Sequence, residues 1–340
     1  MQPAHAVFPD ESQPLSAEAL DHYLTKLKVK ACVASALDEP ALLSYLQELF
    51  LAHMMAIPFH NFDLRKASQS HPAARKPLVL FDQKKMLAGY NGGYCFQNSE
   101  LLFRVLQSMG FDVHRSIAKV LNGLAMDSPE ALAIPATHMV VVVKIGAHSY
   151  LLDPGMIMNG NRKPFLIPAQ TECYREIGNT FKIEKREDTY LVSMHLFPDV
   201  WKSIFQSSLT PATDKTINLQ LLKLQCFPQT LGIRDVICLV AIGTDIGVKT
   251  LLCKQDQKGE LHFEYKIAPN GKFASSGQSF SDIDRAYNFL ISEFGITHIS
   301  KLKFERYCRQ IEWPKLERAA EICFPVDEGE ERQVAGKYYY

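Results

Sequence analysis

The sequence predicts an α+β protein with an N-terminal helical bundle, a central antiparallel β-barrel or sheet, and a C-terminal α/β segment. Three observations support this prediction. Apolar residues recur at helical spacing between residues 16 and 56, short strands separated by turn signals follow between 111 and 195, and apolar strands are mixed with a helix between 197 and 298. A chain of 340 residues is long enough for two or three domains with a substantial core.

The N-terminal helices have recognisable start and stop signals. Ser16 can cap a first helix whose apolar positions run to Leu27, and Pro40 opens a second helix that ends at Pro58. The polar residues 1–15 are expected to form a loose tail, and the basic stretch 66–77 a surface loop. We therefore expect an N-terminal helical domain over residues 1–88.

A third helix is predicted to start directly after the tight turn at Gly92 and Gly93 and to stop at Gly110. This places Cys95 at a helix N-terminus, where unpaired N–H groups and the helix dipole favour a negative charge and therefore a reactive thiolate. The alternative is that Cys95 is a small buried hydrophobic residue, as most intracellular cysteines are. A catalytic cysteine also needs a base.

A histidine and an aspartate lie at the two ends of a predicted hairpin. Two β-rich runs, 138–143 and 148–153, flank residues 144–147. If these four residues form the loop, His138 lies directly opposite Asp153. If the loop is two residues longer or shorter, the two residues are diagonal neighbours but still lie on one face of the hairpin. A carboxylate would fix the ring orientation that a Cys–His nucleophile pair requires. His148, at the turn, is expected on the surface.

The remaining segments complete the predicted organisation. Residues 89–196 are expected to form the nucleophile helix and the barrel domain. In 197–298 we expect a short helix around Trp201, a linker turning into a strand over 214–224, strands over 235–242 and 249–254, and a helix over 281–294. Residues 299–340 are expected to be a C-terminal extension.

Composition limits the classes of function. Lys plus Arg and Asp plus Glu both total 37, so the zero net charge gives no indication of a nucleic-acid or membrane surface. The eight cysteines include no C-x-x-C pair and no zinc spacing, which predicts free thiols in a reducing compartment and no metal site. No signal peptide is visible and no apolar window reaches ~20 residues, so a soluble, cytoplasmic protein is expected.

Three blocks of sequence resemble a known family. Residues 92–96 read Gly-Gly-Tyr-Cys-Phe, residues 57–62 read Ile-Pro-Phe-His-Asn-Phe, and residues 138–155 join a histidine and a valine run to Tyr-Leu-Leu-Asp-Pro-Gly. In this order they resemble the blocks Arg-Gly-Gly-Tyr-Cys-Phe, Ile-Pro-Phe-Glu-Asn-Leu and the histidine and Asp-Val-Gly-Phe-Gly strands of the arylamine N-acetyltransferases. The resemblance runs from about residue 18 to about residue 298.

The resemblance implies roles for particular residues. Cys95 would be the acyl-accepting nucleophile, His138 its base and Asp153 the orienting acid of a cysteine-protease-like core. Residues 197–298 would be the lid domain that closes over the cofactor. The residues expected to line the substrate or cofactor site are Phe59, Thr137 and Gly155.

The sequence also departs from the family pattern in three places. The family's arginine before Gly-Gly is Asn91 here, and its glutamate after Pro-Phe is His60. The loss of both partners of a charged pair leaves no lone buried charge, but it indicates a reshaped site. The family's Gly-Phe-Gly becomes residues 155–157, Gly-Met-Ile, so a branched residue replaces a glycine near the expected coenzyme cleft.

The predicted function is ping-pong transfer of an acetyl group from acetyl-CoA, through a cysteine thioester, to a small aromatic amine or hydrazine, without a metal. One alternative is a Cys-His-Asp hydrolase, or an amide synthase that uses a non-CoA acyl donor. Another is a weakly active binding protein. A thioester panel with and without amine separates the first two, and an unreactive Cys95 would support the third.

Overall fold

The computed structural model describes residues 13–68, 80–157, 161–168, 173–176, 179–197, 200–226, 238–245, 247–256, 258–269 and 276–309. Residues 1–12 of the expected tail, 69–77 of the expected loop and 310–340 of the expected extension lie outside this part. The division of the chain at residues 88, 196 and 298 stays a proposed one.

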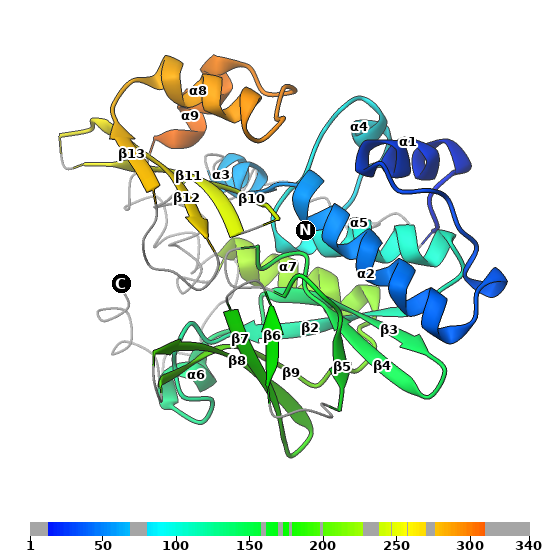
Figure 1. Ribbon diagram of the computed structural model, residues 1–340. Helices are drawn as coiled ribbons and strands as arrows, with labels where there is room; N and C mark the ends of the chain where they lie inside the picture. The colour runs from blue at the N-terminus through cyan, green and yellow to red at the C-terminus, as the bar shows by residue number, and fades with distance from the viewer. Residues whose placement is uncertain are drawn as a thin grey trace, which may run out of the picture.

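Helices dominate the first part of the chain, as predicted. Ser16 accepts a hydrogen bond from the Ala19 amide and Asp38 from the Ala41 amide, so both caps satisfy amides that have no partner within the helix. A short 3-10 helix spans Ala34–Ala36. The α-helices are α1 (Ala17–Leu27), α2 (Glu39–Ala56), α3 (Phe62–Ser68), α4 (Gln83–Leu87) and α5 (Cys95–Ser108), and all of these except α3 lie together on the right of Figure 1.

The central part forms one antiparallel sheet in the order β5-β4-β3-β2-β9-β8-β7-β6 (Figure 1). Its strands are β2 (Asp112–Val120), β3 (His138–Ile145), β4 (His148–Leu152), β5 (Phe165–Ile167), β6 (Tyr174–Glu176), β7 (Asn179–Arg186), β8 (Thr189–Phe197) and β9 (Val200–Ser207). The sheet curls so that its edges meet. Tyr174 of β6 donates a hydrogen bond to the carbonyl of Leu166 in β5, at 2.8 Å, which makes a nearly closed barrel. Helix α6 (Pro129–Ala133) lies between β2 and β3 in the sequence.

The β3–β4 hairpin is present, but the prediction of a four-residue loop is wrong. Ile145 pairs with His148, so the turn contains two residues, Gly146 and Ala147. Gly146 adopts φ of +56°, which glycine tolerates and which suits a two-residue hairpin turn. The shift changes the register by two, so Val141, not Met139, is opposite Leu152. His138 and Asp153 are consequently diagonal neighbours. His148 is exposed at the turn, as expected.

Two further expectations are wrong. The segment around Trp201 is strand β9, not a helix, because a bulge opposite β8 buries the consecutive residues Ile204 and Phe205 and thereby imitates helical spacing. The segment 214–224 is part of helix α7 (Asp214–Cys226), not a linker and strand. Its buried residues Ile217 and Leu221 are four apart, which is the helical interval.

A second antiparallel sheet of order β1-β10-β11-β12-β13 joins the short strand β1, from the N-terminal part, to four strands of the last part of the chain. It contains the two predicted strands and three that were not predicted, β1, β12 and β13. The strands are β1 (Phe59–His60), β10 (Cys238–Gly243), β11 (Gly247–Gln255), β12 (Leu261–Pro269) and β13 (Ser276–Phe280). The predicted helix is α8 (Ile283–Ser292), and α9 (Lys301–Cys308) follows it. Both helices lie beyond this sheet, away from the barrel (Figure 1).

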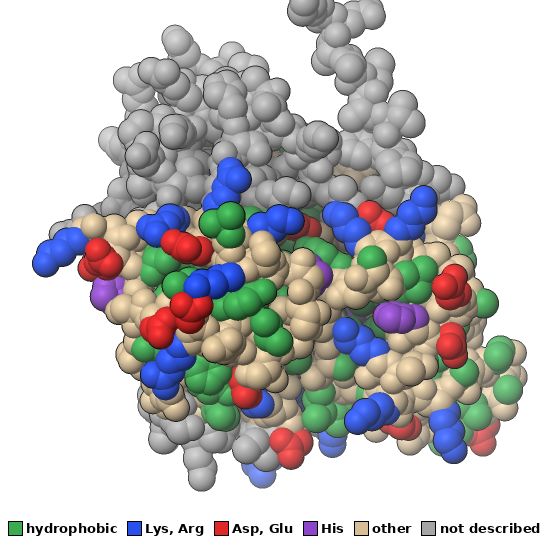
Figure 2. Space-filling model, turned by 90° about the horizontal axis from the view of Figure 1, so that it is seen from above, with side chains coloured by type: hydrophobic (Ala, Val, Ile, Leu, Met, Phe, Trp, Pro, Cys, Tyr) green, Lys and Arg blue, Asp and Glu red, His purple; other side chains and the backbone are tan. Residues whose placement is uncertain are grey.

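The surface and helix lengths add two observations. On the face shown in Figure 2, basic and acidic side chains are interspersed, in agreement with equal totals of 37. None of the helices in the described ranges is long and apolar enough to cross a membrane.

Candidate active site

Two glycines allow the tight turn before α5, and backbone hydrogen bonds hold it in place. Gly92 adopts φ of +77°, and a Cβ atom there would lie 1.9 Å from the carbonyl oxygen of Pro58. The amide of Gly93 donates to that same carbonyl, at 3.2 Å, and the Gly93 carbonyl accepts from the amide of His60. The turn is therefore fixed against β1, and Cys95 becomes the first residue of α5, as predicted.

Helix α5 is also held firmly against the barrel. Ser99 donates a hydrogen bond to the carbonyl of Met139 in β3, at 2.6 Å, and Asn98 donates to the carbonyl of Pro58. Because Ser99 is one turn after Cys95, both residues face β3. The thiol of Cys95 consequently points towards the residues at the start of β3, where its sulfur lies 3.8 Å from the carbonyl oxygen of Thr137.

His138 and Asp153 are in direct contact. The Nε2 atom of His138 lies 2.9 and 3.0 Å from the two carboxylate oxygens of Asp153. The carboxylate also accepts hydrogen bonds from the amides of Gly155 and Met156, at 3.0 and 3.1 Å, so its orientation is fixed. Both side chains are buried, with 2% and 0% of their surface exposed.

The environment favours a protonated imidazole. Burial lowers the pKa of His138, but the charge and hydrogen bond of Asp153, followed by the hydrogen bond and charge of Cys95, outweigh burial and raise this pKa above its ordinary value of 6.5. The sulfur of Cys95 is therefore within hydrogen-bonding reach of the imidazole. Since Asp153 occupies Nε2, the Nδ1 atom is the one left for the thiol.

Gly155 closes the site from the side of the barrel. A Cβ atom at this position would lie 2.6 Å from the Cβ of Cys95 and 3.0 Å from the Cε1 atom of His138. Only glycine allows the loop after β4 to lie against both side chains. The sequence resemblance indicated Gly155 as a lining residue, and the structure shows why this position excludes a side chain.

The other predicted lining residues are placed differently. Thr137 touches the cysteine through its backbone carbonyl. Phe59 lies in β1, bridges Gly93 through its backbone, and has its side chain in the main hydrophobic core with 5% exposed. Ile157, the branched residue at the departure from the family pattern, is also in this core, with 2% exposed.

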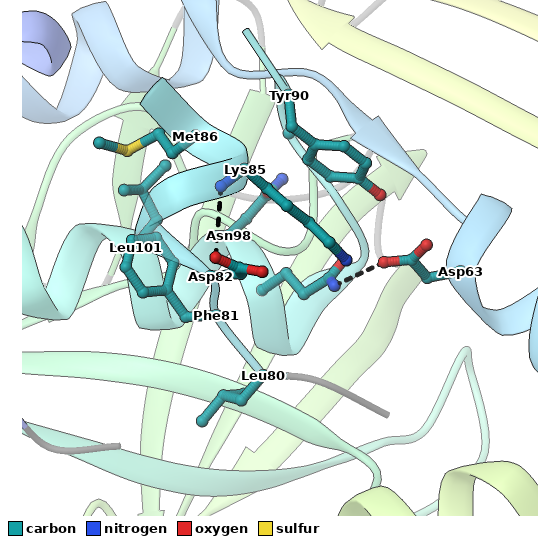
Figure 3. A pocket seen from close by; sticks show the side chains of 11 residues that line it. Asp63, Leu80, Phe81, Asp82, Lys85, Met86, Tyr90, Asn98 and Leu101 are labelled. Atoms are coloured by element: carbon teal, nitrogen blue, oxygen red, sulfur yellow. Dashed lines mark hydrogen bonds between the residues drawn. The ribbon is translucent and has the colours of Figure 1, made fainter. Parts of the chain in front are cut away.

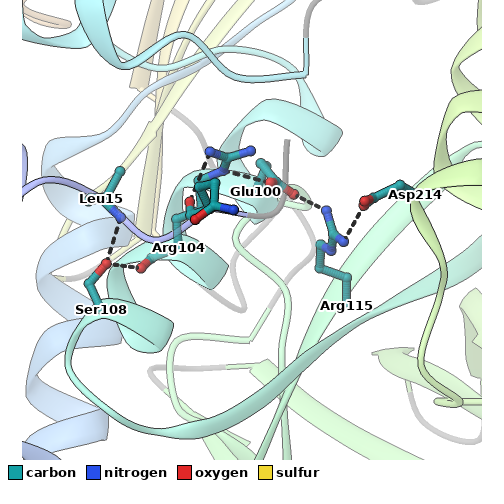
Figure 4. A network of polar contacts seen from close by, with 7 residues as sticks. Leu15, Glu100, Arg104, Ser108, Arg115 and Asp214 are labelled. Atoms are coloured by element: carbon teal, nitrogen blue, oxygen red, sulfur yellow. Dashed lines mark hydrogen bonds and ion pairs between the residues drawn. The ribbon is translucent and has the colours of Figure 1, made fainter. Parts of the chain in front are cut away.

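A buried ionic network that the sequence reading missed anchors α5 (Figure 4). Glu100 has no exposed surface and accepts hydrogen bonds from Arg104 at 2.7 Å and from Arg115 in β2 at 2.9 Å. Arg115 also donates to Asp214 in α7, at 2.6 Å. The four-residue interval between Glu100 and Arg104 was the only visible signal, because the other contacts join distant segments. The network positions the helix that carries Cys95.

The two departures at positions 60 and 91 lie together behind the turn. The Nε2 atom of His60 donates a hydrogen bond to the backbone carbonyl of Asn91, at 3.1 Å, and both side chains are buried. Burial is the largest influence on His60 and lowers its pKa to about 4. This histidine is therefore neutral at physiological pH.

A small pocket lies on another face of α5 (Figure 3). It is lined by Asp63 of α3, Gln97 of α5 and Tyr90 of the segment between α4 and α5, among others, and Gln97 donates to Asp63 at 2.9 Å. Its volume of about 40 Å³ has room for a few water molecules but not for a coenzyme. No group of three or more potential metal ligands occurs within the described ranges.

Comparisons with known proteins identify relatives of this chain. A family model described as N-acetyltransferase matches residues 42–266, more than half of the chain. The chain is 27% identical over 136 residues to the arylamine N-acetyltransferase of Escherichia coli, covering 40% of this chain and 43% of that protein. It is 29% identical over 184 residues to that of Mycobacterium tuberculosis, covering 53% and 60%. These matches span about half the length of the two relatives.

Solved structures of the same kind share the fold. The arylamine N-acetyltransferase of M. tuberculosis superposes with a TM-score of 0.65 at 20% identity, covering 85% of this chain and 99% of that one. The Mycobacterium marinum enzyme in complex with CoA gives 0.61 at 19% identity, covering 90% and 100%. With the family model matched over most of its length, the chain belongs to the arylamine N-acetyltransferase family, an acyltransferase enzyme family.

Proposed function

We propose that this protein transfers an acyl group from an acyl-CoA thioester to the nitrogen of a small aromatic amine or hydrazine, with Cys95 as nucleophile, His138 as base and Asp153 as orienting acid. The observation that carries the proposal is the contact of a helix-terminal thiol with a histidine that a buried carboxylate holds at 2.9 Å. The CoA complex of the M. marinum relative, which has the same fold, supports the choice of donor.

The first half-reaction acylates the cysteine. The raised pKa of His138 favours an imidazolium at neutral pH, and a cation beside a sulfur favours the thiolate, which is the nucleophilic form. The sulfur attacks the thioester carbon, and the backbone amides at the start of α5 can stabilise the oxyanion. The imidazolium then protonates the departing thiolate of coenzyme A.

The second half-reaction returns the enzyme to its starting state. The amine attacks the acyl carbon of the Cys95 thioester, and the now neutral His138 accepts the proton that the amine loses. Asp153 keeps the ring oriented through both steps, because its own orientation is fixed by the amides of Gly155 and Met156. The two substrates react in separate steps, so ping-pong kinetics are expected.

The departures from the family pattern leave these chemical steps intact. Ile157 packs into the core, and the His60–Asn91 contact is neutral, so neither leaves an uncompensated charge near Cys95. They alter the surroundings of the site and therefore bear on which thioester and which amine it accepts.

Intact mass of the purified protein after mixing with acetyl-CoA tests the proposal, with Cys95→Ala as the matched control. We expect the mass to increase by one acetyl group, the increase to be absent in the variant, and an arylamine to discharge it. If no short acyl-CoA gives an adduct while Cys95 still alkylates rapidly, the reaction uses another acyl donor or is hydrolysis. A Cys95 that does not alkylate would exclude the enzyme mechanism.

A further inference from the structure

The first turn of α5 is secured by a side chain of the helix itself. Gln97, the third residue of α5, folds back so that its Oε1 atom accepts a hydrogen bond from the amide of Tyr94, at 3.3 Å. Amides at a helix start have no acceptor within the helical pattern, and a glutamine at this position is one of the side chains that can supply it. Gln97 therefore ties the start of α5, where Cys95 lies, to the turn that precedes it.

The other side of the Gln97 amide is held by a carboxylate of α3. Its Nε2 atom donates to Oδ2 of Asp63, at 2.9 Å, which is the dashed line that reaches Asp63 in Figure 3. Only one orientation of the amide satisfies both partners, because the Tyr94 amide needs an acceptor and the carboxylate needs a donor. Hydrogen bonds to a charged group are about twice as strong as neutral ones, so Asp63 fixes this orientation.

The turn before α5 is shaped to receive the side chain of Gln97. A Cβ atom at Gly93 would lie 2.2 Å from the Oε1 atom and 2.7 Å from the Cβ atom of Gln97. The glycine at position 93 is therefore required by Gln97, whereas Gly92 is required by the carbonyl of Pro58. The two adjacent glycines thus serve two different contacts, and the second of them belongs to the helix start.

We propose that Gln97 and Asp63 are positioning residues for Cys95. Asp63 fixes the amide of Gln97, Gln97 fixes the amide of Tyr94, and the first turn of α5 then presents the sulfur to the imidazole of His138. The inference rests on the proposed function, which makes Cys95 the nucleophile and His138 its base. Neither positioning residue is one of the reacting groups, and both act through the place of the helix start.

Replacement of Gln97 by methionine tests the role of the amide. Gln97→Met keeps the length of the side chain but removes both hydrogen bonds without adding a charge. Alkylation of Cys95 by iodoacetamide at pH 7 should slow about tenfold, less than the ~10²-fold loss that a displacement of 1 Å causes. The rate should also depend more steeply on pH, because a thiol that loses contact with an imidazolium ionises only as the pH rises. A rate within twofold of the parent would overturn the proposal, since the bonds of Asn98 and Ser99 would then suffice to hold the helix.

Reversal of the hydrogen bond separates positioning from a general loss of stability. Gln97→Glu can still accept from the Tyr94 amide, but its carboxylate faces that of Asp63 without a proton between them, so alkylation should again slow about tenfold. The double variant Gln97→Glu, Asp63→Asn has a donor and an acceptor again, in the opposite direction, and keeps the number of carboxylates. It should recover the parent rate to within about threefold. A double variant as slow as Gln97→Glu alone would overturn the proposal.

Asp82→Asn is the matched control for the charge of the pocket. Asp82 lines the same pocket as Asp63, but its carboxylate caps α4 through the amides of Lys84 and Lys85, a role that asparagine also performs. The control should keep the parent rate, and a loss equal to that of Gln97→Met would overturn the proposal. Alkylation needs no acyl donor, so it tests this inference even if acetyl-CoA gives no adduct and the proposed function fails.

Discussion

Substitution of Gly155 by alanine tests the packing of the site directly. The added Cβ would lie 2.6 Å from the Cβ and 2.7 Å from the Cα of Cys95, and 3.0 Å from the Cε1 of His138. Ordinary carbon contacts are about 3.5–4.0 Å, so the loop after β4 and the start of α5 must separate by roughly 1 Å. A displacement of this size at reacting groups lowers rates by about 10²-fold. We therefore expect the thiol and the imidazole to lose contact.

Two rates report this loss. Alkylation of Cys95 by iodoacetamide at pH 7 measures the reactivity of the thiol without any acyl donor, and acetyl transfer to an arylamine measures the full reaction. Gly110→Ala is the matched control, because it lies just beyond the other end of α5, has open space for a Cβ, and introduces strain only through its φ of +82°. The control should lose about 1 kcal/mol of stability but keep both rates. Rates within twofold of the parent in Gly155→Ala would refute the reasoning.

Three further predictions follow from the same site and its supports. Asp153→Asn removes the charge that favours the protonated imidazole of His138. Alkylation of Cys95 near pH 7 should therefore slow on the order of 10²-fold. An unchanged rate would show that the carboxylate is not needed. Glu100→Gln leaves the buried guanidinium groups of Arg104 and Arg115 without their shared carboxylate. It should lower the free energy of unfolding, measured by urea denaturation, by roughly 3–5 kcal/mol. A loss below about 1 kcal/mol would contradict a structural role for the network. Burial lowers the pKa values of His53 and His60 to about 3 and about 4, so both protonate first in the unfolded chain. The stability they allow is complete above pH 6.5 and falls by about 1.4 kcal/mol per pH unit for each histidine as the pH drops towards 4, and His53→Gln should remove one histidine's share of this slope.

The proximity of His138 and Asp153 was predictable from sequence because it depends on which face of the hairpin each side chain occupies, and less on the exact register. The expected four-residue loop and the observed two-residue turn differ by one residue pair, which shifts His138 from opposite Asp153 to a diagonal position. Side chains alternate between faces with a period of two, so both alternatives leave the two side chains on one face. Likewise, the two glycines before Cys95 specify a turn and a helix start whatever lies around them.

The errors arose where tertiary pairing decides the local structure. A bulge in β9 places Ile204 and Phe205 side by side in the core, and no local pattern distinguishes this from one turn of helix. The contacts of Glu100 with Arg115, and of Arg65 with the carbonyl of Arg309, join residues separated by 15 and 244 positions, with no motif at either end. Sequence spacing carries no signal for such contacts, because they depend on how separate elements pack.

The sequence resemblance implies that His60 and Asn91 replace a charged pair of the family, and the structure suggests how this exchange can leave the proposed nucleophile, Cys95, in place. The position of Cys95 depends on the turn before it, and that turn is held by backbone groups: the Gly93 amide on the Pro58 carbonyl, and the His60 amide on the Gly93 carbonyl. The imidazole of His60 adds a hydrogen bond to the carbonyl of Asn91. A neutral imidazole that binds a carbonyl avoids the desolvation that a buried ion pair incurs, and the glycines maintain the shape of the turn. Divergence at these two positions therefore changes the polarity behind α5, while the face of the helix that meets His138 keeps its geometry.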